Sequence, residues 1–129
     1  LQDWSEEMPE EQLLKRYSTT PGDIRAKVDV AEWLLYAATE LARLLAPEAV
    51  AELEQLRTRV THGVRRELLP LLALPSVGRI RARALFNHGF AAPDAFTSAT
   101  EAELARVPGI GPRLAEQLAG RREPEQTTL

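Results

Sequence analysis

A chain of 129 residues that is 44% apolar but only 5% aromatic must build its core from Leu, Ala and Val, a composition that favours helices over a β-sandwich. It contains no cysteine, which excludes disulfides and thiolate metal sites, and no run reaches the roughly 18 apolar residues of a membrane span. The net charge of −3 is unevenly distributed, because residues 57–83 hold seven arginines and one acid whereas residues 1–56 hold twelve acids and five bases. This basic block indicates a nucleic-acid partner or, equally well, a solvated helical face.

Residues 1–73 predict helices joined by short connections around one long helix. The first helix is expected from Pro9 to Tyr17, and Asp23 is placed to cap the next one with its carboxylate. Over residues 24–45 apolar side chains recur at spacings of three and four, which predicts a long helix that is apolar on two flanks. The main stripe consists of Ile24, Val28, Ala31, Leu35, Ala38, Ala42 and Leu45, widened by Leu34 and Leu41. Further helices are expected over 47–62 and 64–72.

From residue 74 the chain repeats one short pattern after 33 residues: residues 74–82 read LPSVGRIRA and residues 107–115 read VPGIGPRLA. In the second copy Gly109 and Gly111 permit a tight hairpin, and Pro112 suits the first position of the following helix. The start of a helix presents free N–H groups and the positive end of the helix dipole, which together attract phosphate. The residues expected to pack inside this copy are Ile110, Leu114 and Ala115.

The first copy departs from the second at one position, where Ser76 replaces the leading glycine although Gly78 is kept. This departure leaves the geometry of the hairpin, and any cation that it binds, as open questions. In compensation, arginines stand at positions 79, 81 and 83 on the following helix, and Arg113 adds a charge beside the second helix start.

Gly89-Phe90 predicts a helix end, and two short helices are expected around 93–96 and 100–106. The second of these opens with Thr100 followed three residues later by Glu103, the pattern of a capping box. The sequence therefore predicts an all-α chain in three parts: a partial helical bundle with a long central helix, a tandem of hairpins and a frayed tail. Their expected bounds are 1–73, 74–121 and 122–129.

The small-hydrophobic-glycine turn followed by a helix resembles the helix-hairpin-helix family, whose members bind the DNA backbone without reading its sequence. This resemblance implies phosphate contacts from the hairpin amides and from the helix that follows each hairpin, with binding that weakens steeply with salt. The implied contacts are Gly78, Arg79, Arg81, Arg83, Gly109, Gly111 and Arg113. The alternative is that both hairpins only connect helices.

The wider chain resembles the C-terminal part of the archaeal Holliday-junction-migration helicases, superfamily-2 enzymes that unwind DNA forks with 3′-to-5′ polarity. The segments that carry the resemblance are EEQLLKRY at 10–17, PGDIR at 21–25, AEWL at 31–34, HGVRRELL at 62–69 and GRIRARAL at 78–85. Family members contribute earlier helices to the same bundle, so the resemblance also implies that the bundle is incomplete in this chain.

The resemblance implies a ratchet helix over 24–45 that contacts translocating single-stranded DNA. In the family a Trp on this helix stacks on a base, and Trp33 matches it; the alternative for Trp33 is a place in the core between packed helices. The family's Arg seven residues earlier is replaced by Ala26, and Arg25 lies one position away, roughly 100° around the helix. The basic block adds Arg65 and Arg66 to the candidate DNA contacts.

Catalytic and metal-binding residues are not expected in this chain. No glycine is followed by lysine, so the phosphate-binding loop of a nucleotide hydrolase is absent, and ATP and Mg²⁺ are implied only for motor domains elsewhere in a parent protein. His62 and His88 are isolated, and no Asp follows Gly120 as a glycosylase of this motif class needs.

The function expected from these patterns is sequence-independent binding of single-stranded or forked DNA, as the C-terminal part of a DNA repair helicase. The implied partners are DNA and the N-terminal helicase core, with no membrane, and the chain is expected to be monomeric and cytoplasmic. Two alternatives are a protein-docking module built on the hairpins and a small protein that regulates a motor supplied by another chain.

Overall fold

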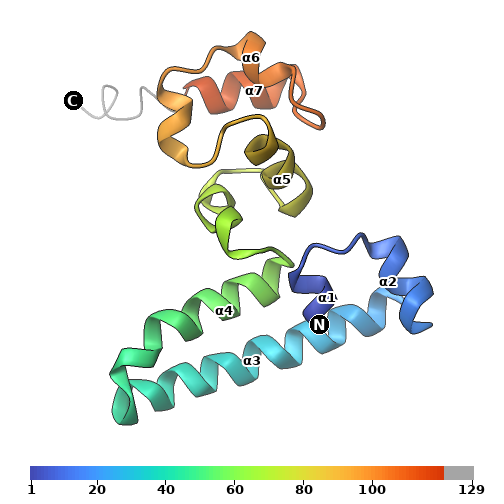
Figure 1. Ribbon diagram of the computed structural model, residues 1–129, viewed down its shortest axis with the longest axis vertical. Helices are drawn as coiled ribbons and strands as arrows, with labels where there is room; N and C mark the ends of the chain where they lie inside the picture. The colour runs from blue at the N-terminus through green and yellow to red at the C-terminus, as the bar shows by residue number, and fades with distance from the viewer. Residues whose placement is uncertain (121–129) are drawn as a thin grey trace. The chain divides into compact units, whose positions relative to one another are not determined.

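The computed structural model describes residues 1–120, and within that range every regular element is a helix (Figure 1). The predicted all-α class is therefore confirmed. Contacts divide the chain into two compact units, one ending at Leu69 and the other beginning at Pro70. The predicted frayed tail lies outside the described residues. Among residues 1–120 no helix combines the length and the apolar character that crossing a membrane requires.

The first unit is a pair of antiparallel helices with two short helices at one end. The helices are α1 (Gln2–Ser5), α2 (Glu10–Tyr17), α3 (Pro21–Leu45), the 3-10 turn η1 (Pro47–Ala49) and α4 (Val50–His62). Along the chain α3 reverses through η1 into α4, and the two lie side by side (Figure 1). The short α1 packs against α4 and α2. The unit is thus organised around the α3–α4 pair.

The long helix begins earlier than predicted, because its capping residue is different. The prediction that Asp23 caps the helix was wrong: the side chain of Thr20 accepts a hydrogen bond from the Asp23 N–H, at 3.1 Å. Pro21 then occupies the first position, where its missing N–H costs no hydrogen bond. Asp23 lies in the first turn instead, beside the positive end of the helix dipole.

The segment predicted as an α-helix over 64–72 is a 3-10 helix, η2 (Arg66–Ala73). Pro70 lies inside it, and a proline both lacks an N–H and clashes with the carbonyl four residues earlier. The tighter 3-10 pattern therefore replaces the α-helix, while Leu68 and Leu71 are still fully buried.

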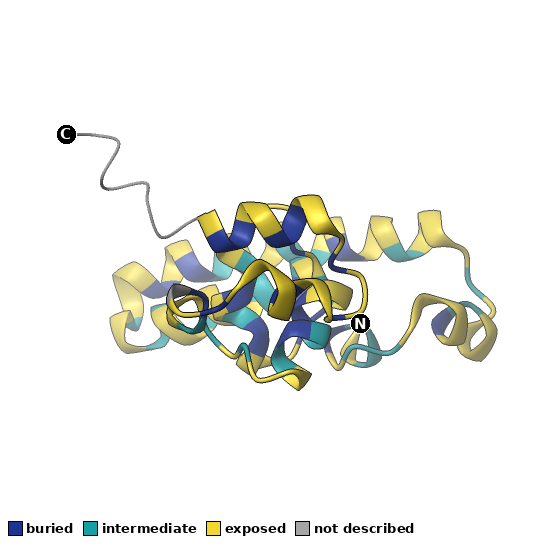
Figure 2. Cartoon of the chain, turned by 90° about the horizontal axis from the view of Figure 1, so that it is seen from above, coloured by how far each residue is buried: buried dark blue, intermediate teal, exposed yellow. Residues whose placement is uncertain are grey.

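Only one flank of α3 is covered within this unit. Buried residues, dark blue in Figure 2, alternate with exposed ones along the helices, as amphipathic helices require. On α3 Val28 and Ala42 are buried against the rest of the unit, but Leu41 is 59% and Leu45 82% exposed. Both leucines belong to the predicted apolar stripe, and they stay exposed because α4 is the only long helix that packs on α3 within the described residues of this unit.

The indole of Trp4 holds α1 against the C-terminal end of α4. Its Nε1 donates to the carbonyl oxygen of Val60 at 2.6 Å, and its ring lies over Gly63. Gly63 ends α4 with φ +68°, a left-handed conformation that glycine adopts without steric penalty. A Cβ at this position would stand 2.6 Å from Cε2 of Trp4, so both the backbone and the contact require glycine.

Charged groups reinforce the same contact. Arg59 of α4 donates through Nε to the carbonyl of Val64 at 3.0 Å, and its Nη2 lies 3.4 Å from Oε1 of Glu6. Glu6 also pairs with Nε of Arg65 at 2.9 Å, while Glu7 accepts a hydrogen bond from the Arg65 backbone N–H. The segment after α1 is thereby fixed to the turn after α4.

We predict that Gly63→Ala lowers the stability of the chain by at least about 2 kcal/mol, because it combines a strained left-handed alanine with displacement of the Trp4 ring. Chemical denaturation followed by circular dichroism measures the change. The matched control is Gly22→Ala in the first turn of α3, where a Cβ meets only Thr20 Oγ1 at 3.9 Å. This control should leave stability unchanged or raise it by about 0.5–1 kcal/mol. A Gly63→Ala protein as stable as the wild type would contradict the packing described here.

The second unit contains the two hairpins and the segment between them. Its helices after η2 are α5 (Arg79–Asn87), the 3-10 helix η3 (Pro93–Thr97), α6 (Glu101–Ala105) and α7 (Pro112–Ala119). The predicted capping box at the start of α6 is confirmed, since Thr100 and Glu103 exchange side-chain to backbone hydrogen bonds of 3.2 Å in both directions. Leucines 85, 104 and 118 are fully buried and form the centre of its core.

Candidate nucleic-acid interface

The two hairpins have the same backbone conformation. Ser76 has φ +61° and Gly109 has φ +84°, and these matched residues both lie in the left-handed region. Two residues later, Gly78 and Gly111 are extended and act as N-caps of α5 and α7. The replacement of glycine by Ser76 therefore does not change the hairpin, although a non-glycine residue in this region costs about 1–2 kcal/mol.

Matched apolar residues anchor both hairpins in the core of the unit. The buried pairs are Leu74 and Val107, Val77 and Ile110, Ala82 and Ala115, and Leu85 and Leu118. The predicted burial of Ile110, Leu114 and Ala115 is confirmed. Because the residue between the left-handed position and the capping glycine points into the core, the capping glycine itself is held at the surface.

The backbone at both capping glycines is open to a ligand. Gly78 and Gly111 are exposed, and a Cβ added to either would meet no atom within 4 Å. The helices that follow run nine and eight residues, so each start carries N–H groups without partners inside the helix and the positive end of a dipole. An anion the size of phosphate can approach both starts.

The arginines near these helix starts have different surroundings. Arg79 is the first residue of α5 and Arg113 the second of α7, and Arg113 is exposed. The guanidinium of Arg83 lies 5.1 Å from the ring centroid of Phe86. Arg81 is exposed but donates from Nε to the carbonyl of Gly109 at 3.0 Å. Arg79 and Arg113 are the arginines that occupy one of the first two positions of these helices.

We predict that Ser76→Gly stabilises the chain by about 0.5–1 kcal/mol, because relief of the left-handed strain exceeds the extra chain entropy of glycine. Urea denaturation measures the difference. The reverse change in the matched position, Gly109→Ser, should destabilise, since it adds the same strain. Equal stability of all three proteins would contradict the left-handed conformation at positions 76 and 109.

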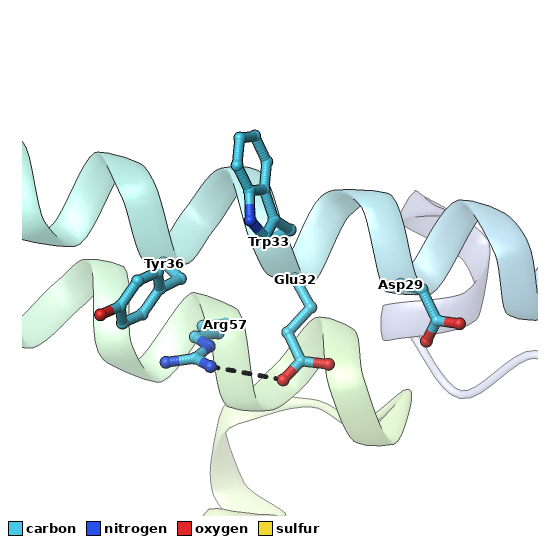
Figure 3. Close-up of a pocket in the computed structure, with 5 residues that line it drawn as sticks. All are labelled: Asp29, Glu32, Trp33, Tyr36 and Arg57. Carbon is cyan, nitrogen blue, oxygen red and sulfur yellow. Dashed lines mark hydrogen bonds and ion pairs between the residues drawn. The ribbon is translucent and has the colours of Figure 1, made fainter.

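A second candidate surface lies on the first unit, around Trp33. This side chain is 66% exposed, so the helices of the first unit do not cover it. It lines an open hollow of about 330 Å³ whose other lining residues are Asp29, Glu32, Tyr36 and Arg57. Figure 3 shows the Trp33 ring projecting away from α4, whereas Glu32 points toward Arg57 of α4.

Tyr36 and Arg57 are residues of this hollow that sequence reasoning missed. The Arg57 guanidinium lies 5.0 Å from the centroid of the Tyr36 ring, and its Nη2 pairs with Glu32 at 3.4 Å (Figure 3). Tyr36 remains 48% exposed. Because residues three apart are neighbours on a helix surface, the sequence could have placed Tyr36 beside Trp33. It could not have predicted the contact with Arg57, which lies on another helix.

The remaining candidate arginines are not gathered around Trp33. Arg25 is exposed on α3, eight residues before Trp33 and so roughly 80° around the helix from it. Arg65 is engaged by Glu6, and Arg66 is exposed at the start of η2. The assignment of these three arginines to DNA stays a prediction.

The basic block is partly neutralised within the first unit. Arg57 pairs with Glu32, and both Arg59 and Arg65 pair with Glu6, so these arginines of the block meet acids from residues 1–56. The segregation of charge along the sequence is therefore not preserved in space. The arginines at 79, 81 and 83 belong to the second unit.

The residues of this chain do not fit Mg–ATP. None of its seven glycines is followed by lysine, so it has no loop of the kind that encloses nucleotide phosphates. Within the described range no three His, Cys, Asp or Glu side chains gather as metal ligands. His88 caps the end of α5 through Nδ1, 2.9 Å from the carbonyl of Ala84.

Two glycine-capped helix starts, repeated on one small unit, define a tandem helix-hairpin-helix domain. Comparison with known families agrees: residues 68–119 match the SAM-like helix-hairpin-helix tandem, and residues 1–63 match domain 4 of archaeal helicases. The two parts of the chain thus resemble, in order, a domain of archaeal helicases and a helix-hairpin-helix tandem.

Proteins similar to most of this chain include ATP-dependent DNA helicases named Hel308. The protein from Pyrococcus abyssi is 45% identical over 115 residues, which is 88% of this chain and 16% of the relative. That from Pyrococcus horikoshii is 44% identical over 117 residues, 89% of this chain and 16% of the relative. That from Thermoplasma acidophilum is 33% identical over 121 residues, 94% of this chain and 18% of the relative. The chain thus spans less than a fifth of the length of these relatives.

Proposed function

We propose that this chain is the DNA-binding C-terminal part of an ATP-dependent 3′-to-5′ DNA repair helicase, and that it binds single-stranded or forked DNA without sequence preference. The observation that carries this proposal is the pair of exposed, glycine-capped helix starts, each with an arginine in its first two positions. Such starts attract phosphate oxygens, which are the same at every nucleotide.

Trp33 supplies the complementary contact to bases. An exposed indole stacks on any base because every base has a π-face, and Tyr36 offers a second exposed ring beside it. The acids at Asp29 and Glu32 disfavour a phosphate in the same hollow. In this proposal Trp33 contacts bases on the first unit, and the hairpins contact phosphates on the second.

The partner proposed for the open flank of α3 is the helicase core of the parent protein, which also binds ATP and Mg²⁺. The exposed residues of this flank are Val30, Leu34, Leu41, Leu44 and Leu45, more apolar surface than one helix normally leaves in water. We place the chain in the cytoplasm as a monomeric part of that protein, in agreement with its lack of cysteine.

A fluorescence-anisotropy titration with labelled single-stranded, duplex and forked DNA, at about 50 and 200 mM salt, tests the proposal. Binding that is independent of base sequence and weakens steeply with salt is expected. Absence of binding at the lower salt concentration would overturn it and favour the alternative, in which the hairpins are a docking scaffold for protein.

We predict that Arg79→Ala combined with Arg113→Ala weakens binding and lowers the slope of log affinity against log salt by about 0.7 per arginine on single-stranded DNA. The same titration at several salt concentrations measures the slope. Arg43→Ala is the matched control, because Arg43 is exposed, pairs with Glu40 and Glu54, and lies on neither hairpin. An unchanged slope in the double variant would remove these residues from the phosphate contacts.

We predict that Trp33→Ala weakens binding of single-stranded DNA by about 1–3 kcal/mol without changing the salt slope, because stacking releases no counterions. Tyr36→Ala should have a smaller effect of the same kind, since one face of its ring is covered by Arg57. Leu44→Ala on the same helix is the control for loss of exposed apolar surface. If all three variants weaken binding equally, stacking is not the contact that Trp33 makes.

A further inference from the structure

One arginine connects the two hairpins. Arg81, the third residue of α5, donates from Nε to the carbonyl of Gly109 at 3.0 Å and from Nη1 to the carbonyl of Ser76 at 2.8 Å. Ser76 and Gly109 are the matched left-handed residues of the two copies. A single guanidinium therefore joins the same atom of both hairpins.

The stem of the side chain is placed for this contact as well. Cγ of Arg81 lies 3.7 Å from the position that a Cβ on Gly109 would occupy, so the stem passes close to the second hairpin. In the repeat, the residue matched to Arg81 is Leu114, which is buried in the core and donates no hydrogen bond from its side chain. The connection therefore exists once in the tandem, from the first copy to the second.

The chemistry of the contact selects arginine. A guanidinium presents N–H donors in a rigid planar fork and can satisfy two carbonyl acceptors that lie apart, whereas an ammonium is a compact charge on a flexible stem. Two donors of Arg81 are engaged, and their direction is set by the two turns. These two hydrogen bonds hold the guanidinium between the hairpins, so it is not oriented to bind a phosphate.

We propose that Arg81 is a positioning residue, which fixes the separation of the two phosphate-binding helix starts, and that Arg79 and Arg113 make the phosphate contacts. This assignment rests on the proposed function, because the distance between the two helix starts matters only if both bind phosphates of the same DNA strand. Without the two hydrogen bonds each hairpin keeps its own fold, but the two starts no longer bind one strand together.

The test compares Arg81→Lys with Arg79→Lys in the 129-residue chain. Both changes keep the charge, but only the first removes the fork that joins the two carbonyls. We expect Arg81→Lys to bind single-stranded DNA about tenfold more weakly with the wild-type salt slope, and Arg79→Lys to bind within about twofold of wild type. Hydrogen exchange of the free protein should rise in the second hairpin, residues 109–111, for Arg81→Lys alone.

Two results would overturn the assignment. One is wild-type exchange in the second hairpin of Arg81→Lys; the other is a salt slope that falls by about 0.7 in Arg81→Ala, as expected for a lost phosphate contact. If Arg81→Ala unfolds the unit, the hydrogen exchange and DNA binding of Arg81→Lys still test the assignment, because lysine keeps an aliphatic stem beside Gly109. If the wild-type chain binds no DNA, the proposed function fails, but the exchange comparison still tests the connection between the hairpins.

Discussion

The left-handed backbone at residues 76 and 109 turns the chain between a helix end and a new helix start, and the candidate interface depends on that turn. Each turn places an apolar residue, Val77 or Ile110, in the core and a glycine at the surface immediately after it. The buried residue fixes the turn, and the exposed glycine leaves the following amides accessible. A binding site made of backbone is therefore held by packing, and the arginines only add charge to it.

The first unit is built on a single pair of long helices, so contacts outside that pair add to its stability. Burial of one flank of α3 by α4 is supplemented by the Trp4 ring on Gly63 and by ion pairs from Arg59 and Arg65 to Glu6. These contacts use arginines that the sequence alone offers for DNA. Trp33 is left uncovered because the other helices of this unit do not pack on the side of α3 that carries it.

Local rules predicted much of this architecture from the sequence. The repeat of 33 residues, the helix start at Pro112 and the capping box at Thr100 all follow from short patterns, and the structure has them. The errors have physical causes: Thr20 competes with Asp23 for the cap, and Pro70 forces a 3-10 helix. Amphipathic periodicity gave two apolar flanks on α3 but could not tell which flank a partner covers. Contacts between distant segments, such as that of Arg81 with Gly109 at a separation of 28 residues, leave no local pattern.

The two tryptophans stand in opposite environments on the same unit. The Trp4 ring is hydrogen-bonded and packed on a turn, whereas the Trp33 ring is mostly in water. An indole in water emits at longer wavelength than one packed against protein, and a base that stacks on an indole quenches its emission. The chain thus carries two intrinsic optical reporters, one for the integrity of the α1–α4 contact and one for occupancy of the α3 surface, without any attached dye.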